Sequence, residues 1–177
     1  SLTFQVVPED AARIAMLQTG EADVIYPVPT TDVGQIEGDP SIIIDVAPAT
    51  TYRYVTLNTE WALPDGRKPF ADKRVRQAFN YAFDSEAYAK VVFNGYAKEP
   101  TSIFSDSIRF YAEQTPYKPD LEKAKALMKE AGFEDGFDVE LIVDNTTIEQ
   151  KGAVFVQQQL SQINVNHRFK RYALTEG

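Results

Sequence analysis

The order of apolar patterns at the start of the chain limits the possible folds more than any other feature. Residues 2–7 alternate apolar and polar side chains, as a strand does, and Pro8 then stands where the first turn of a helix accepts proline. Apolar residues at helical spacing continue to Gly20, and another apolar run, residues 22–26, ends at Pro27. A strand, a helix and a strand in this order predict two parallel strands joined by a crossover helix.

The patterns that follow predict further helices and strands. A short helix is expected over residues 31–37, and the extended runs 42–47 and 51–58 are predicted to form an antiparallel pair of strands. Three more helices are expected to begin at residues that are good caps, namely Asp72, Asp84 and Asp120.

The C-terminal third repeats the alternation of strand and helix. Residues 137–144 predict a strand, residues 148–163 a helix, and residues 164–172 another alternating strand. Taken together, the patterns predict an α/β fold, a mixed sheet with flanking helices, in a single lobe that spans residues 1–177.

An excess of acidic residues narrows the possible partners. The formal net charge is -8 and the sequence pI is about 4.7, whereas a protein that binds nucleic acid normally presents a dense basic face. Basic residues cluster only at positions 73–76 and 168–171, where we expect ordinary solvated surface. The sequence therefore predicts no nucleic-acid partner.

Cysteine is absent and His167 is the single histidine, which limits the chemistry of the chain. The absence of cysteine excludes a disulfide, a thiol nucleophile and a cysteine-ligated zinc site. A Ser-His-Asp arrangement needs a nucleophile beside its histidine, and no nucleophile motif accompanies His167. We interpret His167 as a structural residue of a strand and predict no catalytic residue, no metal site and no cofactor.

The run "KPFADKRVRQAFNYAFD", residues 68–84, has two possible interpretations. Its basic residues are those of a patch that grips an anion, but Val75, Ala78 and Phe79 recur at helical spacing. We therefore predict a capped core helix, and we expect its arginines to bond neighbouring carboxylates and loop carbonyls.

Asn145, Thr146 and Thr147 follow a predicted strand and precede a predicted helix. Loops beyond the carboxyl ends of strands form the ligand crevice in α/β sheets, and free N–H groups at a helix start can hold a carboxylate or carbonyl. The alternative is that Asn145 or Thr147 simply caps the helix. The sequence leaves both interpretations open.

The run "TTYRYVTLNT" offers a second candidate surface. On an extended chain, Tyr52, Tyr54 and Thr56 share one face, and Arg53 lies on the other face with Val55 and Leu57. Tyrosines combine apolar area with a hydroxyl and can line a pocket. They are equally ordinary on a half-exposed sheet.

Two longer motifs carry a resemblance to a known family. They are "DKRVRQAFNYAFD" at residues 72–84 and "PDLEKAKALMKEAGF" at residues 119–133, preceded by "VVPEDAARIAMLQTGEADV" and followed by "QQQLSQINVNHRF". With these motifs in this order, nearly the whole chain resembles the family 5 solute-binding proteins. These are the extracytoplasmic receptors of dipeptide, oligopeptide and nickel ABC importers.

The resemblance implies a fold and a function. It implies one lobe of a two-lobed, type II periplasmic binding protein, with residues 1–177 as most of the C-terminal lobe (domain III) and the N-terminal lobe preceding Ser1. The receptor would capture peptides or similar small solutes and deliver them to the ABC permease subunits, without catalysis. It would work in the periplasm, or at the cell surface with a lipid anchor.

The resemblance also implies which residues meet the ligand. Tyr26 and Pro27, the strand face with Tyr54 and Thr56, and the loop of Asn145, Thr146 and Thr147 correspond to positions that line the cleft. That loop lacks the arginine that grips the peptide carboxylate in dipeptide receptors and is closer to the Asn-Thr-Ser loop of oligopeptide receptors. Peptide is the first expectation and glutathione or another amino-acid derivative the second. A nickel, metallophore or oligosaccharide receptor and a peptide hydrolase lobe are the alternatives.

Overall fold

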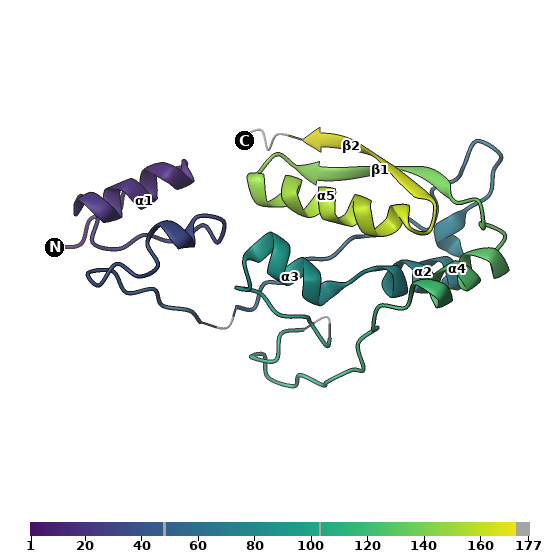
Figure 1. Cartoon of the computed structure of the whole chain (residues 1–177), viewed down its shortest axis with the longest axis horizontal. Coiled ribbons are helices and arrows are strands. Elements are labelled where there is room, and N and C mark those ends of the chain that lie inside the picture. The colour runs from purple at the N-terminus through teal and green to yellow at the C-terminus, as the bar shows by residue number, and fades with distance from the viewer. Residues whose placement is uncertain (48, 103, 173–177) are drawn as a thin grey trace. The chain divides into compact units, whose positions relative to one another are not determined.

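The computed structural model describes residues 1–47, 49–102 and 104–172 (Figure 1). The chain divides into two compact units, residues 1–47 (unit 1) and residues 48–177 (unit 2). We expected a single lobe over residues 1–177, and the assignment of both units to one lobe stays a prediction.

Unit 1 is built around one helix, α1 (Asp10–Thr19). Gly20 ends it in the left-handed conformation, at φ 74°, as the sequence predicts. Arg13 stabilises the segment that precedes the helix, because its Nη1 donates hydrogen bonds to the carbonyls of Val7 (2.9 Å) and Pro8 (3.0 Å). The buried side chains Ile14, Val33 and Ile36 form the small core of this unit.

Several predicted elements are wrong in the described residues. Residues 2–7, 22–26, 42–47 and 51–58 are not strands, so neither the N-terminal parallel pair nor the antiparallel pair is present. The helix expected over residues 31–37 is reduced to the short 3-10 helix η1 (Val33–Gln35). An alternating pattern becomes a strand only when a neighbour completes its hydrogen bonds, and no described strand pairs with these segments.

Unit 2 contains the sheet and most of the helices. Its helices are η2 (Pro69–Ala71), α2 (Lys73–Ala82), α3 (Ser85–Phe93), α4 (Leu121–Glu130) and α5 (Thr147–Ser161). Its strands are β1 (Phe137–Asp144) and β2 (Val165–Tyr172). They are parallel, with Phe137 opposite Val165, and α5 connects them and packs along them (Figure 1). The α/β class is confirmed, and its β-α-β unit lies in the C-terminal third.

The N-termini of three helices confirm their predicted caps. The carboxylates of Asp72, Asp84 and Asp120 accept backbone N–H groups at 2.8, 2.8 and 2.9 Å, respectively. Each carboxylate satisfies a donor that has no partner inside its helix and complements the positive helix end.

An aromatic cluster forms the core of unit 2, where α2 packs against α4 and β1 begins. The ring of Phe137 lies 5.6 Å from Phe70 and 5.5 Å from Phe133, measured between centroids, with edge-to-face geometry. Trp61, the only tryptophan of the chain, adds its ring 5.6 Å from Phe70 and 6.1 Å from Phe137. Edge-to-face pairs add to the stabilisation from burial alone, so this cluster fixes β1 against the helices.

Candidate functional site

The loop of Asn145, Thr146 and Thr147 lies where the sequence predicts it, between the carboxyl end of β1 and the start of α5. Thr146 is the N-cap residue, with extended backbone at φ -78° and ψ 151°, and its side chain makes no capping hydrogen bond. Capping by Asn145 or Thr147 is therefore not what the structure shows. Instead, Nε2 of Gln150 donates to the backbone and side-chain oxygens of Asn145, each at 3.1 Å.

This geometry leaves the start of α5 suited to hydrogen bonding with a solute. All three loop residues are exposed. The first N–H groups of a helix have no acceptor within it, and the helix dipole makes this end partly positive. Because Gln150 binds both oxygens of Asn145, the orientation of Asn145 is fixed from within the helix.

Arg53 joins the tyrosine-bearing segment to the start of α5. Its guanidinium forms an ion pair with Glu149 in the first turn of α5, and it lies over the ring of Phe93, 5.7 Å from the centroid. The pair stays partly open to solvent, with side-chain exposures of 42% for Arg53 and 28% for Glu149. The sequence pattern places Arg53 on the face opposite the tyrosines and indicates no role for it. A lone arginine within an aromatic run was the signal available.

The tyrosine face itself is only partly as predicted. The rings of Tyr52 and Tyr54 lie side by side, 5.5 Å between centroids, and Tyr54 and Thr56 are exposed. Leu57, on the opposite face, packs against the core of unit 2. Residues 51–56 are all exposed, Val55 at 46%, so the two faces do not alternate in burial before Leu57, and Tyr54 and Thr56 are accessible.

Tyr26 and Pro27 belong to unit 1, and a cis peptide bond joins them. Tyr26 is 91% exposed. Their predicted role beside Tyr54 and Asn145, which belong to unit 2, stays a prediction.

Tyr88 supports α5 from α3. Its ring packs against Phe83, Phe93 and Phe155, with centroids 5.4, 5.8 and 5.5 Å away. Burial raises the pKa of Tyr88 above its usual value, and the positive charge of Arg53 opposes that shift. Its hydroxyl approaches Gly152 so closely that a Cβ there would lie 2.5 Å away. Gly152 thus allows α3 and α5 to approach behind the candidate site.

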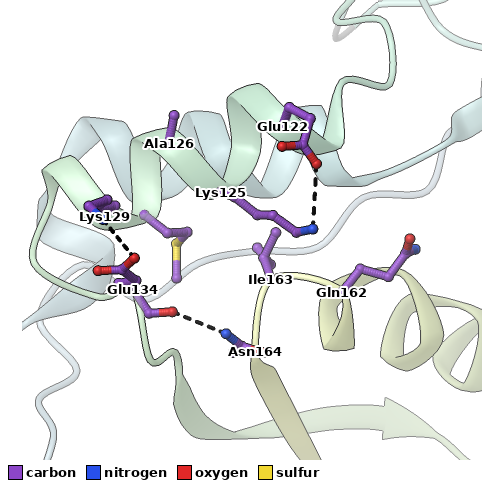
Figure 2. A pocket seen from close by; sticks show the side chains of 9 residues that line it. Glu122, Lys125, Ala126, Lys129, Glu134, Gln162, Ile163 and Asn164 are labelled. Atoms are coloured by element: carbon purple, nitrogen blue, oxygen red, sulfur yellow. Dashed lines mark hydrogen bonds and ion pairs between the residues drawn. The ribbon is translucent and has the colours of Figure 1, made fainter.

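A surface pocket of about 550 Å³ lies elsewhere, between α4 and the turn from α5 to β2 (Figure 2). Figure 2 shows its charged side chains facing one another, with Lys129 bonded to Glu134 at 2.9 Å and Lys125 paired with Glu122 at 3.5 Å. The pocket adjoins the amino ends of both strands, whereas ligands of α/β sheets bind beyond the carboxyl ends. None of the predicted site residues lines it, and we do not assign it a ligand.

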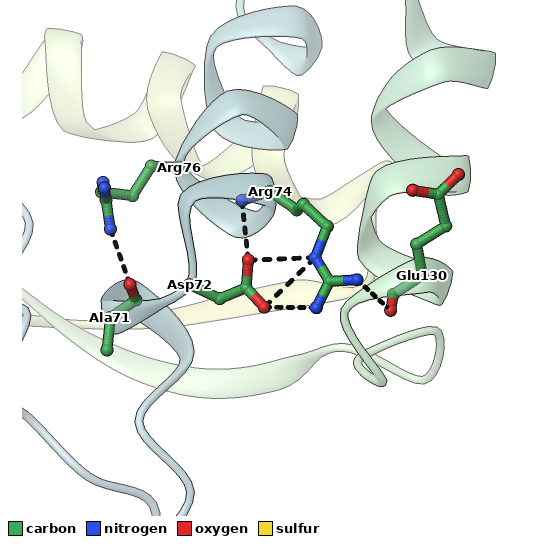
Figure 3. Close-up of polar contacts among 5 residues, drawn as sticks. All are labelled: Ala71, Asp72, Arg74, Arg76 and Glu130. Atoms are coloured by element: carbon green, nitrogen blue, oxygen red, sulfur yellow. Dashed lines mark hydrogen bonds and ion pairs between the residues drawn. The ribbon is translucent and has the colours of Figure 1, made fainter.

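The arginines of the motif at residues 68–84 are engaged as predicted (Figure 3). Arg74 pairs with Asp72 at 2.6 Å, and its Nη1 donates to the carbonyl of Glu130 at 2.8 Å. Arg76 donates to the carbonyls of Phe70 (2.7 Å) and Ala71 (3.0 Å). The bonds from Arg74 lower the pKa of Asp72 below its usual value. The run contains a capped core helix, and its two arginines bond carbonyls at the end of α4 and in η2.

His167 is buried in β2, 8% exposed, and within the described residues its Nδ1 has no hydrogen-bond partner. Burial lowers its pKa below the usual value because the charged imidazolium loses solvation. In residues 1–47, 49–102 and 104–172, no three acidic or histidine side chains gather as metal ligands would. No helix in the same ranges is both long enough and apolar enough to span a bilayer.

Comparisons with known proteins agree with one another. A family model described as "Bacterial extracellular solute-binding proteins, family 5 Middle" matches residues 1–176. The chain is 37% identical over 169 residues to the glutathione-binding protein GsiB of Salmonella typhimurium, which covers 95% of this chain.

Solved structures show the same fold. The periplasmic binding protein DppA of Helicobacter pylori, in complex with the peptide STSA, superposes with a TM-score of 0.83 at 31% identity over 96% of this chain. The oligopeptide-binding protein AppA of Bacillus subtilis, in complex with a nonapeptide, superposes with a TM-score of 0.76 at 26% identity over 95% of this chain. The chain spans about a third of the relatives' length, 32% of both GsiB and DppA.

Proposed function

Because the chain belongs to the bacterial extracellular solute-binding proteins of family 5, we propose that it is part of the substrate-binding component of an ABC importer. The component captures peptides or similar small solutes outside the cytoplasmic membrane and delivers them to the permease. The observation that carries this proposal is the likeness to DppA, whose structure holds a peptide and which matches 96% of this chain.

The residues predicted as ligand contacts offer hydrogen-bonding groups suited to such a solute. Asn145, Thr146 and Thr147 supply amide, hydroxyl and backbone N–H groups at the start of α5, and Tyr54 and Thr56 add an exposed face. Tyr26 and Pro27 of unit 1 stay predicted ligand contacts. Such groups replace the hydration of peptide amides and carboxylates, so the protein binds its solute without transforming it.

Glutathione is the second candidate, favoured by the identity to GsiB, which is named as a glutathione-binding protein. Glutathione shares amide and carboxylate groups with peptides, so the same loop serves both. A nickel or oligosaccharide receptor is a less favoured alternative. The likeness to the nickel-bound NikA of Staphylococcus aureus is one of fold, at 24% identity.

Partners and location follow from this proposal. The remaining part of a longer receptor closes over the solute, and the ABC permease subunits receive it. The receptor works in the periplasm or, with a lipid anchor, at the cell surface.

Ligand binding by the full-length receptor tests the proposal. Thermal unfolding is followed with a peptide library and with glutathione, because a ligand that binds only the folded state raises its apparent stability. We expect Asn145→Ala to weaken binding about 3- to 10-fold, as the loss of a hydrogen bond does. Asn166→Ala is the matched control. Asn166 is the second residue of β2 and pairs with Asp138, at the amino ends of the strands, whereas the Asn145 loop follows the carboxyl end of β1. The absence of a thermal shift with every peptide and with glutathione would contradict the proposal.

A further inference from the structure

Acidic side chains lie on both sides of the loop between β1 and α5. Asp144 is the last residue of β1, and Glu149 lies in the first turn of α5. Residues 144–150 contain these two carboxylates and no basic side chain. Negative charges at the start of a helix offset its positive dipole end, and they repel a solute carboxylate that approaches the free N–H groups. The loop alone is therefore poorly suited to an anion.

Arg53 brings a positive charge to this loop from another segment of unit 2. Its guanidinium forms the ion pair with Glu149 and lies over the ring of Phe93 on α3, 5.7 Å from the centroid. The face of an aromatic ring attracts a cation, so Phe93 helps to hold the guanidinium beside α5. Arg53 thereby neutralises Glu149 with a charge that belongs to the protein. The paired carboxylate is also less available to the ammonium group of a solute.

The partial exposure of the pair sets the size of this effect. The side chains of Arg53 and Glu149 are 42% and 28% exposed, so their charges act in a medium between the protein interior and water. Over about 7 Å, at an effective dielectric constant of about 50, one unit charge changes the binding constant of another about 5-fold. An effect of this size is enough to favour one of two otherwise similar solutes.

We propose that Arg53 is a specificity-determining residue of the proposed site: by neutralising Glu149, it lets the start of α5 accept the free carboxylate of a solute. The preferred solutes are then those with an unblocked carboxylate, either at the C-terminus of a peptide or on glutathione. This inference rests on the proposed function, because it requires a solute at the loop of Asn145.

Calorimetric titration of the full-length receptor tests the inference with two matched pairs of solutes. One pair is the peptide STSA, which is bound in the DppA structure, and its C-terminal amide. The other pair is glutathione and its diethyl ester. The amide and the ester lack the carboxylate charge, so we expect the acid of at least one pair to bind about 10-fold more tightly than its neutral form. The pair that shows this difference identifies the source of the carboxylate.

Substitutions of the two charged residues should act in opposite directions. Arg53→Gln should weaken binding of the acid about 5-fold, because Glu149 is then left to repel it, and Glu149→Gln should not weaken it. The double variant and Arg53→Lys should both bind the acid nearly as the unsubstituted receptor does. Neutral solutes should change by less than about 2-fold throughout, and raising the salt from about 0.05 M to about 0.5 M should shrink the loss in Arg53→Gln.

Two further lysine variants separate this effect from a general loss of positive charge. Lys129→Gln is the matched control, because Lys129 pairs with Glu134 beside the pocket at the amino ends of the strands (Figure 2). Lys151→Gln tests the next basic residue along α5. We expect neither variant to reduce the preference for the acid as Arg53→Gln does, and an equal reduction in either would overturn the inference.

A purely structural pair would give a different pattern. Arg53→Gln and Glu149→Gln would then weaken acids and neutral solutes alike, and the double variant would not recover. That pattern would overturn the inference while leaving the proposed function in place, since the unsubstituted receptor still binds its solute. Failure of the unsubstituted receptor to bind either acid would instead count against the proposed function, and the inference would fall with it.

Discussion

The guanidinium of Arg53 and the carboxylate of Glu149 form an ion pair between residues 96 positions apart, and the pair joins the tyrosine-bearing segment to the first turn of α5. Phe93 lies under the same guanidinium, so the cation is held from two sides. This contact brings together two segments that sequence patterns single out separately. It makes Arg53 a positioning residue of the candidate site.

Removing either charge of this pair is expected to have a small effect on stability. Arg53→Gln and Glu149→Gln should each lower the free energy of unfolding by about 0.5–1 kcal/mol, because a partly exposed pair gains little in water. The double variant should cost less than the sum, since each change already breaks the pair. Chemical denaturation of the unsubstituted protein, the two single variants and the double variant measures this coupling energy. The exposed pair of Lys90 and Glu86 is the control, and an Arg53–Glu149 coupling of zero would contradict the role of the contact.

Gly152→Ala should have opposite effects in two backgrounds. The added Cβ would lie 2.5 Å from the Tyr88 hydroxyl, and three packed rings leave Tyr88 little room to move. We expect Gly152→Ala alone to lower the melting temperature. Combined with Tyr88→Phe it should stabilise α5, because alanine has the higher helix propensity by about 1 kcal/mol. Destabilisation of equal size in both backgrounds would show that the hydroxyl is not the obstacle.

Gly136 requires glycine for two reasons that can be separated. Its φ is 72°, and an added Cβ would lie 1.8 Å from the backbone oxygen of Asn164, which cannot move away as a side chain can. Gly132 has a similar φ of 80° with nothing within 4 Å of the same position. Gly132→Ala should therefore cost about 1–2 kcal/mol from the backbone conformation alone, and Gly136→Ala distinctly more. Denaturant midpoints of the two variants test this order, and equal losses would refute the clash.

Stability should fall as the pH is lowered through the histidine range. Burial lowers the pKa of His167 in the folded state, so the unfolded chain takes up a proton first as the pH falls below about 6.5. The contribution of the neutral imidazole to the free energy of unfolding is fully present above that pH. It is lost as the pH falls from there to the pKa of His167 in the folded state. Melting temperatures between about pH 5 and 7.5 measure this slope, and His167→Leu should flatten it. An unchanged slope in the variant would assign the effect to other groups.

Asp72→Ala should weaken the start of α2. The carboxylate accepts the backbone N–H of Arg74 and also binds its guanidinium, so the loss should be about 1 kcal/mol or somewhat more. Asp65→Ala is the control, because Asp65 binds Arg67 in a loop and caps no helix. Circular dichroism during thermal unfolding compares the two, and a larger loss for Asp65→Ala would contradict the capping role.

Local signals predicted the helices of unit 2 well. Capping aspartates, helical spacing and a terminal glycine are properties of neighbouring residues, and they located α2, α3, α4 and α5 to within a few residues. The strand β1 and the loop at Asn145 were found for the same reason. The interpretation of the motif at residues 68–84 as a core helix is confirmed by the burial of Val75 and Ala78.

Non-local features were the ones that sequence reasoning missed. The alternation over residues 2–7 is real, but whether it becomes a strand depends on a neighbour that local sequence does not specify. The Arg53–Glu149 contact likewise joins segments whose proximity no local pattern encodes. No turn or capping signal marks Gly152. The need for glycine at this position follows only from the nearby hydroxyl of Tyr88.

The solitary tryptophan of the chain gives the molecule a built-in optical probe. Trp61 packs on Phe70 and Phe137 in the core of unit 2, so its emission changes when that core opens. Unit 1 contains no tryptophan, so its unfolding does not directly change the tryptophan emission. A comparison of tryptophan emission with far-ultraviolet dichroism on one sample therefore reports whether the two units melt together or one after the other.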